Sequence, residues 1–274
     1  MTRSQPGPGL AQGGDWVRIL VTNDDGIQAP GLRVLARELA GLGSVLVVAP
    51  DRERSGTGHG ITVHTPLRVT PVDWGEGIQA FTLNGTPADC VKLGIDALAD
   101  GPCDLVMSGV NRGPNLGTDV LYSGTVSGAV EGYLQGLPAL AVSLDSFTSR
   151  EQAYVPAARL ARNLAEKLLG LEAPLLLNVN VPAPRAEGPA KGVRITRLGV
   201  RRYRDVFHRR TDPRGKAYYW LAGRAVDLDQ GPDTDASAVR EGYISVTPIH
   251  FDLTHHEMIQ TLKGWDWSFL LSPA

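Results

Sequence analysis

The chain has 274 residues, of which 42% are hydrophobic and 20% are charged, and both proportions are ordinary for a globular protein. Its 27 Lys and Arg residues nearly balance its 29 Asp and Glu residues, so the formal net charge is −2. This balance excludes a strongly basic protein that binds a nucleic-acid polymer. No apolar run reaches the roughly 18 residues that a membrane-spanning helix needs.

Residues 1–15 lack the apolar stretch of a signal peptide, and we expect them to form a disordered tail. The two cysteines, Cys90 and Cys103, do not have the spacing of a metal site and suit unpaired thiols in a reducing compartment. We therefore predict a cytoplasmic protein with no membrane partner.

The first ordered segment, residues 17–22, is a β-branched run typical of a buried strand, and turn residues 23–26 end it. Pro30 then opens an amphipathic helix, and residues 45–49 form a second buried strand. Strand, helix and strand at this spacing predict a βαβ unit, the building block of parallel sheets.

The same alternation continues to residue 181. Expected strands cover residues 78–83, 105–108, 139–143 and 175–181, and expected helices cover residues 86–98, 125–135 and 151–169. Thr86 is the expected cap of its helix, with Pro87 first in the helix and Asp89 near its positive end. The pattern predicts that residues 16–184 form a three-layer, Rossmann-like α/β core around a doubly wound, mostly parallel sheet.

Residues 185–274 have a different composition. Residues 193–226 are rich in Arg, Tyr and Thr and contain a turn signal at 211–215, which predicts a β-hairpin arm projecting from the core. A returning strand at 243–249 and a last helix starting at Thr254 complete the chain, the helix being indicated by a capping box. Because such an arm has little core of its own, we assign this part of the domain to oligomerisation.

Four polar loops follow predicted strands, at residues 23–26, 51–56, 84–86 and 108–125. In an open α/β sheet, ligands bind at the carboxyl ends of the strands, so these loops should converge on one site. Residues 26–33 have the glycine spacing of a phosphate-binding P-loop but lack its Lys-Ser/Thr. The chain also lacks the Gly-x-Ser-x-Gly elbow of an α/β-hydrolase.

Asp24 and Asp25 are adjacent carboxylates at the end of a buried strand, where they repel each other unless a cation or hydrogen-bond donors compensate. Mg²⁺ prefers such oxygen ligands, and the Ser55 hydroxyl and the Asn111 amide oxygen could join them. The alternative is a turn whose aspartates cap the next helix.

The run Ser123, Gly124 and Thr125 leads directly into a predicted helix. Small hydroxylated residues and free backbone N–H groups at a helix start can bind an anion such as phosphate. The alternative is an ordinary Ser or Thr cap with no ligand.

Taken in order, these loops resemble the SurE family of survival-protein nucleotidases. The resemblance is carried by Thr22-Asn23-Asp24-Asp25-Gly26, Ala49-Pro50-Asp51-Arg52 with Arg54-Ser55-Gly56, Asn84-Gly85-Thr86-Pro87-Ala88-Asp89-Cys90-Val91, Ser108-Gly109-Val110-Asn111 with Gly113-Pro114-Asn115-Leu116-Gly117, and Tyr122-Ser123-Gly124-Thr125-Val126. It implies a Rossmann-like fold whose C-terminal arm is exchanged in a homodimer or homotetramer.

The resemblance also implies a metal-dependent 5′-nucleotidase that hydrolyses nucleoside 5′-monophosphates, with further activity on 3′-monophosphates and short polyphosphate. One divalent cation per subunit, Mg²⁺ or Mn²⁺, is implied. The implied metal ligands are Asp24, Asp25, Ser55 and Asn111. The implied catalytic residues are Asp24, Asp25, Asn115, Ser123 and Thr125. The implied substrate and phosphate ligands are Asn84, Gly85, Thr86, Asn111, Asn115, Ser123, Gly124 and Thr125.

Two chemical routes stay open, namely attack by a metal-bound water and a base or nucleophile role for Asp24 or Asp25. Three other classes also remain: a metal-dependent glycosyltransferase, a non-catalytic nucleotide-binding or chaperone-like module, and a haloacid-dehalogenase-type phosphatase. The last is disfavoured because Asp24 and Asp25 are adjacent, whereas that class uses Asp-x-Asp.

Overall fold

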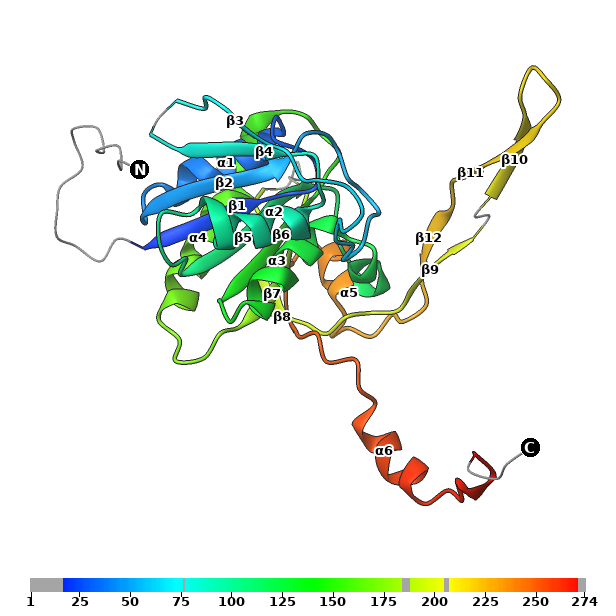
Figure 1. Cartoon of the computed structure of the whole chain (residues 1–274). Helices are drawn as coiled ribbons and strands as arrows, with labels where there is room; N and C mark the ends of the chain where they lie inside the picture. The colour runs from blue at the N-terminus through cyan, green and yellow to red at the C-terminus, as the bar shows by residue number, and fades with distance from the viewer. Residues whose placement is uncertain (1–16, 76, 184–187, 205–206, 271–274) are drawn as a thin grey trace.

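A computed structural model describes residues 17–75, 77–183, 188–204 and 207–270, and the tail expected at residues 1–15 lies outside them. A nine-stranded sheet crosses the body of the molecule (Figure 1), in the order β3-β4-β2-β1-β5-β6-β7-β13-β8. Its strands are β1 (Arg18–Thr22), β2 (Ser44–Pro50), β3 (Val69–Pro71), β4 (Gln79–Leu83), β5 (Leu105–Arg112), β6 (Ala139–Asp145), β7 (Leu176–Pro182), β8 (Val193–Ile195) and β13 (Ile244–Ile249).

The sheet is mostly parallel. The pairs β3–β4 and β7–β13 are antiparallel, and the other pairs are parallel. Starting from β1, the chain first winds outward through β2 and β4, and then returns to the other side of β1 as β5, β6 and β7. The strand order therefore reverses between β1 and β5, which is where doubly wound folds bind their ligands.

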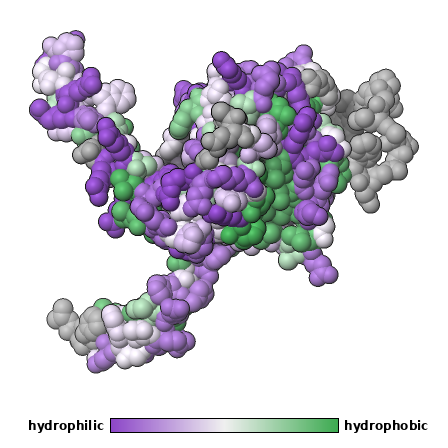
Figure 2. All heavy atoms as spheres, turned by 180° about the vertical axis from the view of Figure 1, so that it is seen from behind, coloured by the Kyte–Doolittle hydropathy of each residue, from purple (hydrophilic) through white to green (hydrophobic). Residues whose placement is uncertain are grey.

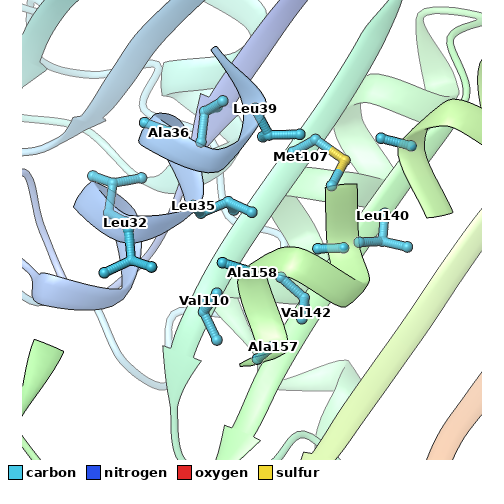
Figure 3. Close-up of a cluster of buried hydrophobic side chains, with 14 of the residues drawn as sticks. Leu32, Leu35, Ala36, Leu39, Met107, Val110, Leu140, Val142, Ala157 and Ala158 are labelled. Atoms are coloured by element: carbon cyan, nitrogen blue, oxygen red, sulfur yellow. The ribbon is translucent and has the colours of Figure 1, made fainter. Parts of the chain in front are cut away.

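Helices cover both faces of this sheet. On one face, α1 (Pro30–Leu39) and α4 (Val155–Leu169) pack with β5 and β6 into one hydrophobic cluster, and Figure 3 shows their side chains meeting. On the other face, α2 (Pro87–Leu93) and α3 (Gly124–Leu134) contribute to a second cluster. The expected three-layer, doubly wound α/β core is therefore confirmed.

The start of α2 has the predicted caps. Thr86 Oγ1 accepts a hydrogen bond from Asp89 N at 3.1 Å, and Asp89 Oδ2 accepts one from Thr86 N at 2.8 Å. Pro87 is the first helical residue, where its missing N–H costs nothing. The helix continues into one π-helical turn, Gly94–Leu98.

Strand β5 is longer than predicted. Residues 109–112 were expected to belong to a glycine-rich loop, but Asn111 and Arg112 pair with Ser143 and Leu144 of β6 after an irregularity in the register. The pairing partner overrides the low strand propensity of the glycine here. Asn111 is consequently held by the sheet rather than by a loop.

The C-terminal part forms two projections from the body (Figure 1). In the arm, β9 (Arg201–Arg204) pairs with β12 (Arg224–Asp227), and β10 (Phe207–Thr211) pairs with β11 (Ala217–Leu221). The hairpin was expected from residue 193, but residues 193–195 join the main sheet as β8, so the arm starts later. Its turn is where the sequence predicted it, with Gly215 N donating to Asp212 O.

The second projection carries α6 (His256–Lys263) and a 3₁₀ turn, Ser268–Leu270. The predicted cap Thr254 is wrong, because the His255 ring accepts from Met258 N while Thr254 N donates to Asp252. Short helices not predicted from the sequence are α5 (Asp235–Arg240) and the 3₁₀ turn Gly117–Leu121, whereas the start of the helix expected at 151–169 is a separate 3₁₀ turn, Glu151–Ala153. No helix in the described residues has both the length and the apolar character that crossing a membrane requires.

Close packing of α1 on β5 gives a first prediction. A Cβ added at Gly31 would lie 2.0 Å from the Val110 carbonyl oxygen, so Gly31→Ala must push the helix away from the strand. We expect this variant to lose roughly 1–3 kcal/mol of unfolding free energy in a urea titration. Gly41→Ala is the control, because its nearest neighbour is the flexible Arg162 guanidinium at 3.5 Å. Equal stability of the two variants would contradict the packing described.

Candidate active site

A cavity of about 680 Å³ opens at the carboxyl ends of β1 and β5, where the strand order reverses. Five of the predicted site residues line it: Asp24, Ser55, Asn111, Asn115 and Ser123. Tyr122 and the root of the arm, including Tyr203, line the same cavity. The structure thus brings together core side chains that are up to about 100 positions apart in the sequence. This agrees with the prediction that the loops after the strands converge.

A larger hollow of about 880 Å³ lies at the other ends of the strands, near Val17, Asp104 and Pro174. In parallel α/β sheets, ligands bind at the carboxyl ends of the strands, and the predicted site residues gather there as well. We therefore take the smaller cavity beside Asp24 as the candidate active site.

The turn after β1 places the two aspartates. The Asn23 side chain closes it by accepting from Gly26 N at 3.2 Å and donating to Gly26 O at 3.1 Å. Gly26 has φ +96°, and a Cβ there would lie 3.1 Å from the Arg52 backbone, so both conformation and space require glycine. The β-strand and this turn together fix the backbone of Asp24 and Asp25.

Asp24 is buried against the start of α3. Its Oδ1 accepts a hydrogen bond from the Thr125 hydroxyl at 2.5 Å, and its backbone oxygen accepts one from Arg54 N at 2.7 Å. Burial raises the pKa of the Asp24 carboxyl above its usual value, although the Thr125 hydrogen bond opposes that effect. The ionised carboxylate is therefore costly in the absence of a compensating charge.

Asp25 lies beside the same cavity, in a smaller neighbouring hollow of about 240 Å³ that Arg112 also lines. Its Oδ2 accepts from Arg112 N at 2.9 Å, and the Arg112 guanidinium lies 3.9 Å from Oδ1. Burial raises the pKa of Asp25 to about 6, and the charge of Asp24 adds to the shift. Arg112 compensates only in part, because its guanidinium also pairs with Glu53 at 3.1 Å.

These residues fit a hard divalent cation. Two adjacent carboxylates, one buried and one partly buried, have raised pKa values and need positive charge nearby. Asn111, whose Nδ2 donates to Gly113 O, has its amide oxygen available as a ligand. Ser55 is exposed on the next loop, and its hydroxyl hydrogen bonds to Glu53 Oε1 at 2.8 Å. No cluster of three or more His, Cys, Asp or Glu side chains suited to a metal occurs in the described part of the chain, so these mixed oxygen ligands define the candidate.

Helix α3 points its N-terminus at Asp24. Ser123 caps the helix by accepting from Val126 N at 3.0 Å, the contact named above as the alternative to phosphate binding, and its role toward phosphate stays a prediction. A Cβ at Gly124 would lie 2.7 Å from the Asp24 Cβ, so only glycine permits this approach of helix and carboxylate. The first N–H groups of an α-helix have no partner within it and attract anions, so a phosphate here would lie close to Asp24.

Asn115 is buried in a polar network. Its backbone N donates to Asn180 Oδ1 at 2.8 Å, and its Nδ2 donates to Ser143 Oγ at 2.8 Å. The side chains of Asn178 and Asn180 both donate to its backbone oxygen, at 2.9 and 3.0 Å. Three strand residues thus fix the position of Asn115 at the cavity wall.

The loop at residues 84–86 has a different place. Asn84 Oδ1 accepts from Arg68 N at 2.7 Å, its backbone oxygen accepts from Arg54, and Thr86 is occupied as the cap of α2. None of Asn84, Gly85 and Thr86 is among the residues lining the cavity. Their substrate-binding role stays a prediction, and the contacts present are structural.

Sequence reasoning did not single out four residues at the site: Arg112, Asp119, Tyr122 and Tyr203. Arg112 could have been suspected, because it follows Asn111 in a strand that ends at the site. Tyr203 is separated from Tyr122 by about 80 residues, and nothing in its own sequence indicates that the arm turns back toward the cavity.

Comparison with known proteins agrees with this geometry. A family model described as "Survival protein SurE" matches residues 19–205. The chain belongs to the SurE family. This match includes every site residue named above. It also extends through β9 to the root of the arm.

SurE relatives match nearly the whole chain. A protein of Heliobacterium modesticaldum named "5′-nucleotidase SurE" is 53% identical over 91% of this chain and 92% of its own. A protein of Moorella thermoacetica with the same name is 55% identical over 90% of this chain and 95% of its own. The crystal structure of the SurE protein from Aquifex aeolicus has a TM-score of 0.75 at 40% identity and covers 93% of this chain and all of that one.

The raised pKa of Asp25 gives a stability prediction. The unfolded carboxyl ionises near pH 3.8 and the folded one near 6, so stability is lost as the pH rises through this window. At pH 7.5 the cost is on the order of 1–3 kcal/mol in metal-free protein. Asp25→Asn removes this cost of ionisation, and the asparagine oxygen can still accept the hydrogen bond from Arg112 N. We therefore expect a melting temperature several degrees above wild type at pH 7.5 and a smaller gain at pH 5.

The control is Asp73→Asn, an exposed loop position whose hydrogen bond to Gly75 N an asparagine oxygen can keep. Its melting temperature should equal that of wild type at both pH values. A loss of stability in Asp25→Asn at pH 7.5, or an equal gain at both pH values, would contradict the cost of ionising the Asp25 carboxyl in the folded protein, which comes mainly from its burial and also from the charge of Asp24.

Proposed function

We propose that this chain is a metal-dependent 5′-nucleotidase that hydrolyses nucleoside 5′-monophosphates to nucleoside and phosphate. The observation that carries the proposal is the approach of the α3 N-terminus to the buried Asp24, next to the partly buried Asp25, at the switch point of the sheet. SurE relatives that match over nine tenths of the chain are named 5′-nucleotidases, which supports the same activity here. Activity on 3′-monophosphates and short polyphosphate belongs to the proposal as well.

Asp24, Asp25, Ser55 and Asn111 are proposed to hold one cation, Mg²⁺ or Mn²⁺, per subunit. When bound, such a cation neutralises phosphate charge and activates an oxygen nucleophile. Thr125 positions Asp24 through its hydroxyl hydrogen bond, and the strand backbone of Arg112 positions Asp25. The carboxylates are thereby held without freedom to turn away.

Phosphoryl transfer depends mainly on positioning and charge stabilisation, and this chain has groups for both. The N–H groups of Gly124 and Thr125 at the start of α3 can donate to the phosphate oxygens, whereas the next one, Val126 N, already donates to Ser123 Oγ. Ser123 and Asn115 line the cavity beside them, Asn115 being fixed by its network. We propose that these residues orient the phosphate toward Asp24.

The arm and the α6 segment are proposed to bind a second copy of the chain, giving a homodimer or homotetramer. Both projections stand clear of the body and carry hydrophobic atoms among hydrophilic ones (Figure 2). Trp220 and Leu221 on the arm, and Leu253 and Trp265 near α6, are exposed in the single chain. A two-stranded ribbon is marginally stable alone, so a partner is expected. A light-scattering mass equal to one chain would overturn this.

We further propose that residues 16–184 are the catalytic core and residues 185–274 its oligomerisation part, within one domain. Strands β8 and β13 of the C-terminal part belong to the main sheet, which supports a single domain. The two cysteines, Cys90 and Cys103, are free and buried, which supports a cytoplasmic location.

The nucleotidase proposal is tested by phosphate release from a panel of nucleoside monophosphates, with Mg²⁺, Mn²⁺ or excess chelator. Wild type should release phosphate with a divalent cation, and the chelator should stop it. Asp24→Asn should lose at least about 100-fold in rate, because it removes an anionic ligand of the proposed cation, which in turn stabilises the charge on the reacting phosphate. The control Asp73→Asn should match wild type.

Two results would contradict the proposal. Release that persists in chelator would remove the metal from the reaction. Binding of nucleotides without hydrolysis under any metal would favour the non-catalytic module, and turnover of nucleotide sugars alone would favour a glycosyltransferase.

A further inference from the structure

We propose that the root of the arm completes the active site as the nucleobase-binding wall, with the base stacking between Tyr203 and Tyr122. This inference rests on the proposed function, because it assigns the nucleoside end of the same substrate. It makes the arm part of the specificity of the enzyme as well as a candidate subunit contact.

One cavity can hold both the phosphate end and the nucleoside end of the proposed substrate. Asp24, Asn111 and Ser123 line it together with Tyr122 and Tyr203. Its volume of about 680 Å³ exceeds what a phosphate alone requires and falls in the range of small-molecule sites. A phosphate at the start of α3 therefore leaves room for the nucleoside toward the tyrosines.

The root of the arm is tied to the core next to this cavity. Asp119, in the 3₁₀ turn before Tyr122, accepts hydrogen bonds from Arg201 Nη1 at 3.1 Å and from the Tyr203 hydroxyl at 2.9 Å. Thr118 in the same turn donates to Arg201 O at 2.6 Å and accepts from Arg201 N at 3.2 Å. The backbone and side-chain contacts together fix where the Tyr203 ring lies.

Both tyrosines lie on anchored segments at the cavity and are exposed to water. Gly223 packs against Tyr203, since a Cβ there would lie 3.1 Å from the Tyr203 Cβ, and Tyr122 is held by the bond from Gly58 N to its backbone oxygen at 3.0 Å. Yet 64% of Tyr122 and 46% of Tyr203 is exposed to water. Exposed aromatic rings on anchored segments can bind nucleobases by stacking. Removing one such ring weakens binding by on the order of 10-fold or more per base.

Tyr203 has a competing role as a structural lock, because its hydroxyl bonds to Asp119. The two roles use different parts of the side chain. Stacking needs the ring, whereas the lock needs the hydroxyl, so Tyr203→Phe and Tyr203→Ala separate them.

The test compares AMP with glycerol 2-phosphate, a phosphate monoester without a base, at saturating Mg²⁺ in the full-length protein. For Tyr203→Ala and for Tyr122→Ala, the ratio of kcat/KM for AMP to that for glycerol 2-phosphate should fall about 10-fold, through KM for AMP. Tyr203→Phe should restore the wild-type ratio. Tyr218→Ala, an exposed tyrosine on the same arm that is outside the cavity lining, is the matched control and should keep the ratio.

A second measurement separates this inference from the proposed function. Adenosine, which carries no phosphate, is titrated calorimetrically into wild type and Tyr203→Ala in the presence of chelator. Weaker binding to Tyr203→Ala would support the base platform even if the protein hydrolysed no monophosphate. An unchanged AMP ratio in both alanine variants, a loss in Tyr203→Phe equal to that in Tyr203→Ala, or equal adenosine binding would overturn the inference.

Discussion

The candidate active site depends on two neighbouring carboxylates, Asp24 and Asp25, whose backbone positions are fixed side by side. Asp24 is buried, its neighbour Asp25 is partly buried, and both are held by the end of β1 and by the turn that Asn23 closes. Burial raises the pKa of both carboxyl groups, so ionising them destabilises the folded protein unless a positive charge lies nearby. A bound divalent cation offsets this cost, so the stability of the fold and the proposed catalysis depend on the same site.

The surrounding fold converts this charge pair into a phosphate site. Gly124 lets α3 approach Asp24, so the helix N-terminus and the proposed cation position face the same space. The extension of β5 to Arg112 fixes Asn111 and aligns the backbone N–H that bonds Asp25. On the far side, Asp119 connects the 3₁₀ turn before α3 to the arm, so the phosphate and nucleoside ends share one framework.

The sequence predicted the parts that depend on local pattern. Alternating buried strands and amphipathic helices indicated the doubly wound core, and polar residues at strand ends located Asp24, Asn111 and Ser123. The glycine-rich run after Ser108 concealed the continuation of β5, because cross-strand pairing with β6 is non-local. Likewise, the contribution of Tyr203 depends on the path of the arm back to Asp119, for which composition and periodicity give no signal.

The most direct measurement of the central claim is anomalous scattering at the manganese edge from crystals soaked in saturating Mn²⁺. We expect a peak in every chain within about 2.5 Å of the carboxylates of Asp24 and Asp25. Saturated crystals with no peak there, or with Mn²⁺ bound only at other positions, would contradict the view that Asp24 and Asp25 form a cation site.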